Sequence, residues 1–306
     1  MTEIGTWTQP TRDGAPIEGI WVMACEPEGV NIGLVAGADQ VLVVDTGSSP
    51  EQGRQIAESV RDLLGRQVDH VVITHAHWDH LWGLAGFDGA ESHAHESVEE
   101  SLAWAGGDEA RELREQLNVD ASELVAPTHP ISLVHALDLG DLRVELLHFG
   151  PAHTQGDLLV SIPSRKVWFT GDLLETSGDP QFDATSSIET WPMALDGILG
   201  GATDDHRYVP GHGPVATRMD VFEQRANISM LYGAGEQLVR RGVKLDAALK
   251  AIDNPLDENG NPRPSASEWE WPFSTETVKA ALPKVYAELA AHGMTPRTQL
   301  PLLGRM

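Results

Sequence analysis

Three histidines and an aspartate lie within six residues, at His75, His77, Asp79 and His80, directly after the apolar run 71–73. Imidazole nitrogen and carboxylate oxygen are ligands that Zn²⁺ and Fe²⁺ accept without a thiol. In an extended or turning segment the first two histidines point the same way, whereas the aspartate and the last histidine reach a second point. We therefore predict a metal site, and the spacing favours two adjacent ions over one. A histidine-rich surface loop is the simpler alternative, but the buried-strand pattern before the segment argues against it.

The elements before this segment are predicted to deliver it to the end of a strand. Three short apolar runs between residues 20 and 44 are separated by turn residues, which predicts a β-meander. Ser49, followed by a proline and a glutamate, has the features of a helix N-cap, and Gly65 marks the end of that helix. A buried strand at 68–74 then places the histidines at its carboxyl end, where open α/β sheets present their ligands.

Further strands and helices are predicted after the histidine segment. Residues 96–117 have a helical pattern, interrupted by a glycine pair, and form a segment long enough to cover the mouth of the site. The later strands are expected at 131–134, 142–149, 158–162 and 167–170, and residues 208–210 lead to His212. The later helices are expected at 188–199, 221–241, 243–252 and 275–291.

Three later segments carry more candidate ligands. Those around His153, Asp172 and His212 have the sequences Gly-Pro-Ala-His-Thr-Gln-Gly-Asp, Thr-Gly-Asp and Pro-Gly-His-Gly-Pro. Together with the histidine segment at 75–80, they resemble the motifs of the metallo-β-lactamase superfamily, in the order in which the superfamily has them. The resemblance covers about residues 20–216.

This resemblance implies a fold and a division of the chain. Residues 1–216 would form an α/β domain, a four-layer αββα sandwich with two similar β-rich halves. Residues 217–306 would form a helical C-terminal appendage packed on that domain. These last helices are also the surface through which we expect a homo-oligomer, if one forms.

The resemblance also implies a ligand set. Seven side chains would hold two Zn²⁺ ions: the first by His75, His77 and His153, the second by Asp79, His80 and His212, and both by the bridging Asp172. Many β-lactam-hydrolysing members have a cysteine at the bridging position, followed by a lysine, so this chain is more similar to glyoxalase II, the lactonases and related esterase-like members. The resemblance places Asp45 beneath the ions, as support outside the ligand set.

Such a ligand set implies a dinuclear zinc hydrolase. Metal binding lowers the pKa of water from about 15.7 to about 7, so a hydroxide that bridges the ions is present at neutral pH. It would attack the carbonyl of an ester, thioester, lactone or amide-type bond. Asp79 is the candidate catalytic residue, and it either orients this hydroxide and moves its proton or acts only as a ligand.

Other activities of the same superfamily remain open. A persulfide dioxygenase has the same motifs but binds a single iron ion through two histidines and one aspartate. A β-lactam hydrolase without the bridging cysteine is also compatible with the histidine segment. A non-catalytic role is disfavoured because the ligand set is complete. Metal content distinguishes the first of these activities, because it requires one iron rather than two zinc ions.

The substrate is expected to be a small molecule. Four tryptophans could form an aromatic wall for an apolar or ring-bearing substrate: Trp78, Trp82, Trp104 and Trp191. The alternative is that they pack in the core. No basic cluster suited to glutathione or another strongly anionic thioester is evident, because the arginines between residues 109 and 115 alternate with glutamates.

Composition limits the partners and the compartment. Acidic residues outnumber basic ones by 46 to 21 in 306 residues, for a formal charge of −25, which repels phosphate backbones and disfavours nucleic acid. No apolar run approaches the roughly 20 residues of a membrane span. The N-terminus lacks the basic and apolar regions of a signal peptide. We therefore predict a cytoplasmic protein that binds neither nucleic acid nor membrane.

Two features outside the motifs are interpreted as structural. Cys25, the only cysteine, lies in an apolar run and is expected in the core rather than as a nucleophile. His93 and His95 also have a spacing of two residues, but the resemblance places an outer strand there. Both histidines are therefore interpreted as structural or peripheral.

Overall fold

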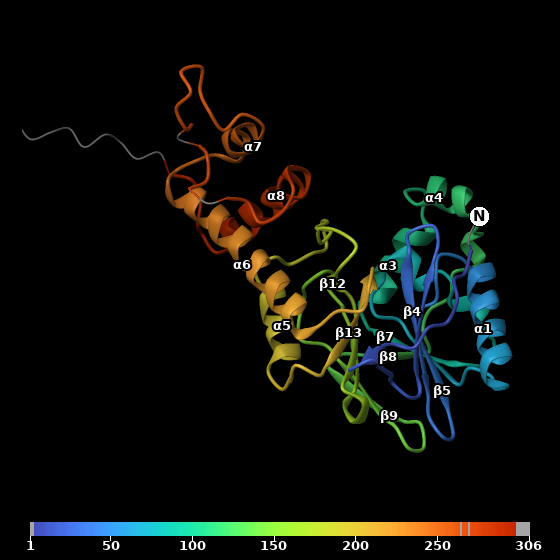
Figure 1. The fold of residues 1–306 in the computed structure, drawn as a ribbon. Helices are drawn as coiled ribbons and strands as arrows, with labels where there is room; N and C mark the ends of the chain where they lie inside the picture. Colours follow the sequence, from blue (N-terminus) through green and yellow to red (C-terminus); the bar gives the residue numbers. More distant parts are fainter. Residues whose placement is uncertain (1–2, 264, 269, 298–306) are drawn as a thin grey trace, which may run out of the picture.

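The computed structural model describes residues 3–263, 265–268 and 270–297. Eleven strands form one hydrogen-bonded sheet in the order β8-β7-β6-β5-β4-β13-β12-β11-β10-β9, with β3 paired to β4. The sheet folds over where β13 meets β4 through the pair His212 and Val30, so its two halves face each other. Figure 1 shows helix α1 on one outer side and helices α5, α6 and α8 on the other.

The first half of the sheet comes from the first part of the chain. Its strands are β3 (Ile20–Cys25), β4 (Val30–Ala36), β5 (Val41–Val44), β6 (His70–Val72), β7 (Glu91–His95) and β8 (His129–Ile131). Strands β3, β4 and β5 are antiparallel, as the predicted meander requires, and β5 to β8 are parallel. A separate two-stranded ribbon, β1 (Thr11–Arg12) and β2 (Ala15–Pro16), precedes them.

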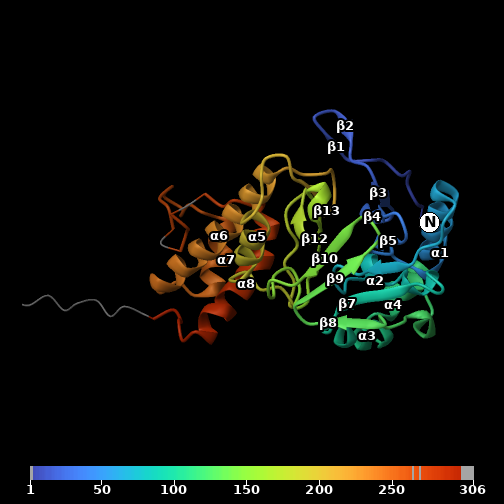
Figure 2. The same cartoon turned by 90° about the horizontal axis from the view of Figure 1, so that it is seen from below.

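The second half of the sheet follows in the chain. Its strands are β9 (Val134–Asp138), β10 (Arg143–Leu147), β11 (Leu159–Ile162), β12 (Val167–Glu175) and β13 (Arg207–His212). Strands β9 to β12 are antiparallel neighbours, and β13 returns parallel to β12. Figure 2 shows this half beside the first, with the helices of the C-terminal part beyond it.

The helices follow the strands that they cover. Those of the first part are α1 (Pro50–Leu64), α2 (Trp78–Leu81), α3 (Val98–Gly106) and α4 (Arg111–Leu117). Those of the second part are α5 (Trp191–Leu199), α6 (Arg218–Arg240), α7 (Leu245–Asp253) and α8 (Thr275–Ala291). Three short 3₁₀ turns are η1 (Leu84–Gly86), η2 (Ala121–Glu123) and η3 (Pro163–Arg165).

Strand β5 shows why the molecule has four layers. Val41 and Val43 are buried in a core with helix α1, whereas Leu42 and Val44 are buried in the core between the two halves of the sheet. Both faces of the strand are therefore covered, and neighbouring residues on a strand point to opposite faces. A third core joins the outer face of the second half to helices α5, α6 and α8. This arrangement is the predicted αββα sandwich with C-terminal helices.

The cap signals in the sequence identify helix α1 correctly. Ser49 Oγ accepts a hydrogen bond from the Gln52 backbone N–H at 3.2 Å, which satisfies one of the free donors at the start of the helix. The helix ends at Gly65, which has the left-handed conformation at φ 67°. Glycine adopts this conformation without strain because it has no Cβ. The helix occupies the predicted residues.

Two strand predictions need correction. The single strand expected at 131–134 is instead the end of β8 and the start of β9, because the chain passes there from one half of the sheet to the other. The strand expected to stop at residue 170 continues to Glu175, since its partner β13 continues to pair beside it. Asp172 therefore lies within a strand rather than after one.

The C-terminal helices share a continuous core with the second half of the sheet. Leu231 of α6 and Val285 of α8 are fully buried there with Leu195 of α5. Residues 298–306 of the predicted appendage lie outside the described residues, and the domain boundary at 216 and 217 stays a prediction, as does a homo-oligomer. No helix in the described part of the chain is both long and apolar enough to span a membrane.

Candidate metal centre

Strand β6 and helix α2 supply the ligand candidates from the first half of the sheet. His75 and His77 follow the end of β6, and the first turn of α2 contains Asp79 and His80. Such a short helix presents consecutive residues in different directions, so its side chains reach points that a strand could not reach. The expected delivery of the histidines at the carboxyl end of β6 is found.

The second half supplies the remaining candidates. His153 lies in the loop between β10 and β11, Asp172 lies in β12, and His212 ends β13. Because β12 and β13 are parallel, their carboxyl ends meet at one edge of the sheet. The pairing of β12 shifts register around Gly171, an irregularity that turns the strand beside the cluster.

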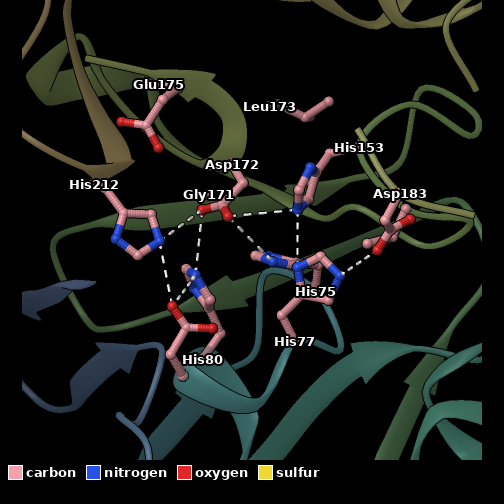
Figure 3. A network of polar contacts seen from close by, with 12 residues as sticks. His75, His77, His80, His153, Gly171, Asp172, Leu173, Glu175, Asp183 and His212 are labelled. Carbon is pink, nitrogen blue, oxygen red and sulfur yellow. Dashed lines mark hydrogen bonds and ion pairs between the residues drawn. The ribbon is translucent and has the colours of Figure 1, made fainter. Parts of the chain in front are cut away.

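The Asp172 carboxylate lies between two groups of histidines (Figure 3). Its Oδ2 is 3.6 Å from His75 Nε2 and 3.4 Å from His153 Nε2. Its Oδ1 is 3.2 Å from His80 Nε2 and 3.5 Å from His212 Nε2. One carboxylate oxygen therefore faces each group, as expected of a bridging ligand.

Two further contacts complete the groups. His77 Nδ1 lies 3.0 Å from His153 Nε2, and Asp79 Oδ2 lies 3.3 Å from His212 Nε2. The candidate donors thus separate into a set of His75, His77, His153 and Asp172 and a set of Asp79, His80 and His212. Tetrahedral zinc with bonds of about 2.1 Å holds its ligand atoms about 3.4 Å apart, which is close to these separations.

Several donors of the cluster are buried without a hydrogen-bond partner. They are the Nε2 atoms of His75 and His80 and the Oδ1 atom of Asp172. A buried polar atom without a hydrogen-bond partner lowers the stability of the fold by about 1–3 kcal/mol. Several such atoms that converge on one point are therefore unfavourable unless a ligand binds them. Divalent cations with a preference for imidazole and carboxylate fit this donor set.

Asp45 holds histidines of both groups. Its Oδ2 lies 2.8 Å from His80 Nδ1, and the same carboxylate accepts hydrogen bonds from the backbone N–H and the hydroxyl of Thr74. The Thr74 hydroxyl oxygen is 3.1 Å from His75 Nδ1. Asp45 has φ 65°, a conformation rare outside glycine and typical of functional positions. These contacts leave the Nε2 atoms of both rings directed at Asp172.

The electrostatics of the cluster come from two carboxylates enclosed by histidines. Burial alone lowers the pKa of His212, but contacts with Asp172 and Asp79 raise it to about 10. Burial lowers the pKa of His153 to about 4 and that of His75 well below its ordinary value. Burial raises the pKa of Asp172, but the histidines more than offset this and hold it well below its ordinary value. The carboxylates are therefore ionised and attract positive charge into the centre.

Residues 25–217 match the model of the metallo-beta-lactamase superfamily. The chain belongs to this superfamily. The matched range contains all seven candidate ligands, so the observed cluster lies in the segment that defines the family.

Relatives within the superfamily differ in activity. The metallo-beta-lactamase type 2 of Bacillus cereus is 25% identical over 190 residues, which are 61% of this chain and 68% of the relative. The acyl-coenzyme A thioesterase MBLAC2 of Bos taurus is 30% identical over 169 residues, which are 47% of this chain and 58% of the relative. The solved structure of the metallo-beta-lactamase FIM-1 from Pseudomonas aeruginosa in its mono-zinc form has a TM-score of 0.57 at 24% identity, covering 74% of this chain and 94% of that one.

The sequence did not single out Asp183 in this superfamily member. Asp183 lies in the loop between β12 and α5, and its Oδ2 is 3.1 Å from His77 Nε2. Its other oxygen accepts from the backbone N–H groups of Thr185 and Ser186, which is a common turn arrangement. The only local signal, an aspartate followed by hydroxyl residues, indicates that turn and not the contact with a histidine.

Two neighbouring cavities open beside the cluster. One of about 380 Å³ is lined by His77, Asp79, Asp172, His212, Glu28, Trp78, Glu175, Ser177, Gln181 and Asp183. The next, of about 500 Å³, shares Glu28 and Trp78 with the first and is also lined by Pro27, Ser49, Glu51, Leu113, Gln116, Leu117 and Asn118. Residues of helix α4 thus line the second cavity, beside the one that contains the ligand candidates. Among the described residues, no lysine or arginine lines either cavity.

The four candidate tryptophans have different environments in this fold. Trp78 lines both cavities, and Trp104 is 49% exposed on helix α3. Trp82 and Trp191 are buried, so the alternative of core packing is confirmed for them and they form no aromatic wall. Trp191 instead packs against a ligand candidate, because its ring centroid lies 5.5 Å from that of His153. Its indole N–H donates a hydrogen bond to the Leu173 carbonyl.

Proposed function

We propose that this superfamily member is a dinuclear zinc-dependent hydrolase that cleaves an ester, thioester, lactone or amide-type bond. The observation that carries the proposal is the placement of the Asp172 carboxylate, with one oxygen toward each histidine group. Nitrogen-rich and carboxylate sites of this kind suit zinc. The superfamily match supports hydrolysis as the reaction class, because the similar proteins include a metallo-beta-lactamase and a thioesterase.

Each group of side chains would hold one ion. His75, His77 and His153 would bind the first, and His80, His212 and Asp79 the second, with Asp172 shared. Bound zinc supplies hydroxide at neutral pH and polarises a carbonyl. The support of His75 and His80 by Asp45 would keep their Nε2 atoms directed at the ions.

Asp79 has two roles in this proposal. Its Oδ2 lies 3.3 Å from His212 Nε2 and 3.6 Å from His80 Nε2, so it belongs to the second ligand group. The same residue lines the cavity beside the cluster, where it faces an incoming substrate. We propose that Asp79 is a ligand through Oδ2 and that its carboxylate also takes up a proton during the reaction.

The substrate proposed here is neutral or cationic near the scissile bond. Glu28, Glu175 and Asp183 add negative charge to a cavity already bordered by the ligand carboxylates. A phosphate-bearing or otherwise anionic leaving group would be repelled from this rim. The similarity to an acyl-coenzyme A thioesterase therefore supports acyl transfer to water more strongly than it supports that relative's own substrate.

Metal analysis together with a substrate panel tests the proposal. The purified chain is assayed for zinc and iron by elemental mass spectrometry and for hydrolysis of chromogenic ester, thioester, lactone and β-lactam substrates, before and after chelation. We expect at least two zinc ions per chain and turnover that chelation abolishes and zinc restores. One iron ion and no hydrolysis would overturn the proposal and favour persulfide dioxygenation.

A pair of variants shows whether the bridging position is responsible. Asp172→Asn keeps the size of the side chain but removes its charge, and we expect activity to fall at least about 100-fold with a loss of zinc. Asp196→Asn changes a surface carboxylate that pairs with Arg225 outside the centre, and should behave like the parent. Equal activity of Asp172→Asn and the parent would exclude this assignment.

A further inference from the structure

A second group of histidines lies away from the metal centre, at the start of the parallel strands. His70 begins β6, Glu91 begins β7, His93 lies in β7 and His129 begins β8. We call these four residues the edge cluster. The metal centre lies beyond the opposite, carboxyl end of β6, so the two groups are separated by the length of that strand.

The register of the strands places the edge cluster on one face of the sheet. His70 pairs with Glu91, and His93 pairs with His129, while Glu91 and His93 are two residues apart on one strand. Paired residues on neighbouring strands and residues two apart on one strand share a face. Val72, which pairs with His93, is buried in the core between the halves of the sheet, so the edge cluster faces the second half.

Three residues of the edge cluster have donor atoms at separations that suit one ion, and the fourth contacts one of them. His70 Nδ1 lies 3.3 Å from His93 Nε2 and 3.6 Å from Glu91 Oε2. The same Glu91 oxygen lies 3.8 Å from His129 Nε2. The donor atoms of His70, Glu91 and His93 all lie within 4.8 Å of one another, near the spacing of about 3.4 Å in a tetrahedral zinc site. The exposed His129 side chain contacts this group through Glu91, and its movement toward the group would supply the fourth donor.

His70 is already held in the orientation that a ligand needs. Its Nε2 lies 3.1 Å from Gln40 Oε1, so the ring donates that N–H to the amide oxygen and leaves the Nδ1 lone pair directed at the edge cluster. Metal-binding histidines commonly have such an outer hydrogen-bond partner, which fixes the tautomer. His70 is buried, so water does not compete for this hydrogen bond and the ring keeps its orientation.

The edge cluster combines buried and accessible donors. His93 is only 2% exposed, whereas the side chains of Glu91 and His129 are 61% and 51% exposed. An ion could therefore enter from solvent and be held by the buried rings. His135 of β9 faces the same region, with its ring centroid 5.6 Å from that of His93. Strands β8 and β9 are the two ends of the sheet order, so the edge cluster lies where its free edges approach each other.

We propose that the edge cluster is a second metal site, which binds one divalent transition-metal ion such as Zn²⁺ through His70, Glu91, His93 and His129. Its ligands come from three strands, and a bound ion therefore ties β6, β7 and β8 together at an open edge of the sandwich. Free sheet edges are liable to pair with other chains, and a metal clamp is one way to hold such an edge. His93, interpreted from the sequence as structural or peripheral, would be one of the ligands of this site.

Zinc stoichiometry tests the edge cluster without reference to activity. The full chain is stripped by chelation, dialysed against buffered Zn²⁺ and analysed for zinc per chain. His93 is a core position, so the exposed pair is changed instead, in Glu91→Gln/His129→Ala. We expect this double variant to bind one zinc equivalent fewer than the parent and to keep the parent's hydrolytic activity. Equal zinc content in the double variant and the parent would overturn the proposal.

Two more variants separate this site from the metal centre. Asp172→Ala removes the bridging carboxylate, and we expect it to retain the zinc equivalent that Glu91→Gln/His129→Ala loses, even if the hydrolase proposal fails. Asp172→Ala without any bound zinc would count against an independent edge site. His292→Ala removes another exposed histidine, which pairs with Glu189 outside the edge cluster, and should bind as much zinc as the parent.

Discussion

The Asp45 carboxylate lies 2.8 Å from His80 Nδ1, and through the Thr74 hydroxyl it also reaches His75. One residue outside the ligand set therefore orients a histidine in each of the two groups. Its left-handed backbone is a local strain that the hydrogen bonds of its carboxylate offset. The centre consequently depends on the turn after β5 as well as on the ligands.

Removal of this support should weaken metal binding without unfolding the chain. For Asp45→Asn we expect zinc affinity to fall by about 10- to 100-fold, because His80 loses an ionic partner and its preferred tautomer. Competition with a chromogenic chelator measures the change. Asp120→Asn is the matched control, since Asp120 also accepts a backbone N–H, from Ser122, but lies far along the chain. Parent-like affinity in Asp45→Asn would show that the contact does not position the ligand.

Asp183 should act on the first ion through His77. Burial raises the pKa of Asp183, but hydrogen bonds with His77 and Thr185 more than offset this and keep it below its ordinary value. Because its pKa is lower in the folded chain than the unfolded value of about 3.8, the ionised carboxylate stabilises the folded chain at pH values above 3.8. This stabilisation is lost as the pH falls below that value. We expect Asp183→Asn to release one zinc ion more readily, about tenfold, and to lose part of this acid sensitivity.

Stripping curves at pH 7, and thermal unfolding between pH 3 and 7, measure both effects. Asp196→Asn again provides the control, because Asp196 contacts a surface arginine and no histidine of the centre. A variant at Asp183 with unchanged zinc release would mean that His77 is oriented by His153 alone.

Gly211 is required by the position of Asp172. A Cβ at Gly211 would lie 1.7 Å from Asp172 Oδ1, so Gly211→Ala must displace the bridging carboxylate. A misplacement of about 1 Å at a catalytic centre costs about 100-fold in rate, and we expect at least that loss together with reduced zinc content. Gly201→Ala is the control, because a Cβ there meets no atom within 4 Å. Full activity in Gly211→Ala would contradict the bridging geometry.

The thiol of Cys25 should be unreactive in the folded chain. Burial raises its pKa to about 12, and the residue is fully buried in the core with α1. Because its folded pKa lies above the unfolded value of about 9, its contribution to stability is complete below about pH 9 and is lost as the pH rises toward 12. At pH 8 we expect alkylation only after denaturation, as counted by intact mass. Rapid labelling of the native chain would contradict this burial.

Sequence patterns predicted the features that depend on neighbouring residues. The cap residues defined helix α1, and alternating apolar runs indicated the strands of the first half, because these patterns reflect local backbone geometry and burial. The seven candidate ligands were also named from motifs, and the structure brings all of them together. Their role as ligands stays a prediction that the zinc measurements test.

Other features depend on residues that are far apart in the chain. Trp78 and Trp82 lie four residues apart and their ring centroids are 6.4 Å apart, yet Trp78 lines the cavities and Trp82 is buried. The length of β12 followed from its pairing with β13, which no local pattern records. Tertiary contacts of this kind decide the length of a strand where the pairing partner, rather than the propensity of the residues, stabilises it.

The sequence alone determined the residue types, their order and the fold family, because short motifs and periodicities are written in consecutive residues. Only the tertiary structure decided that Asp172 stands between two histidine groups, that Asp183 meets His77, and that His70 meets His93. The residues of each of these pairs lie more than 20 positions apart in the chain. The contacts of Asp172 with His75 and His80 also join the two halves of the sheet. Such contacts exist because burial of the apolar faces brings the strand ends together, and the spacing of residues along the chain does not record that packing.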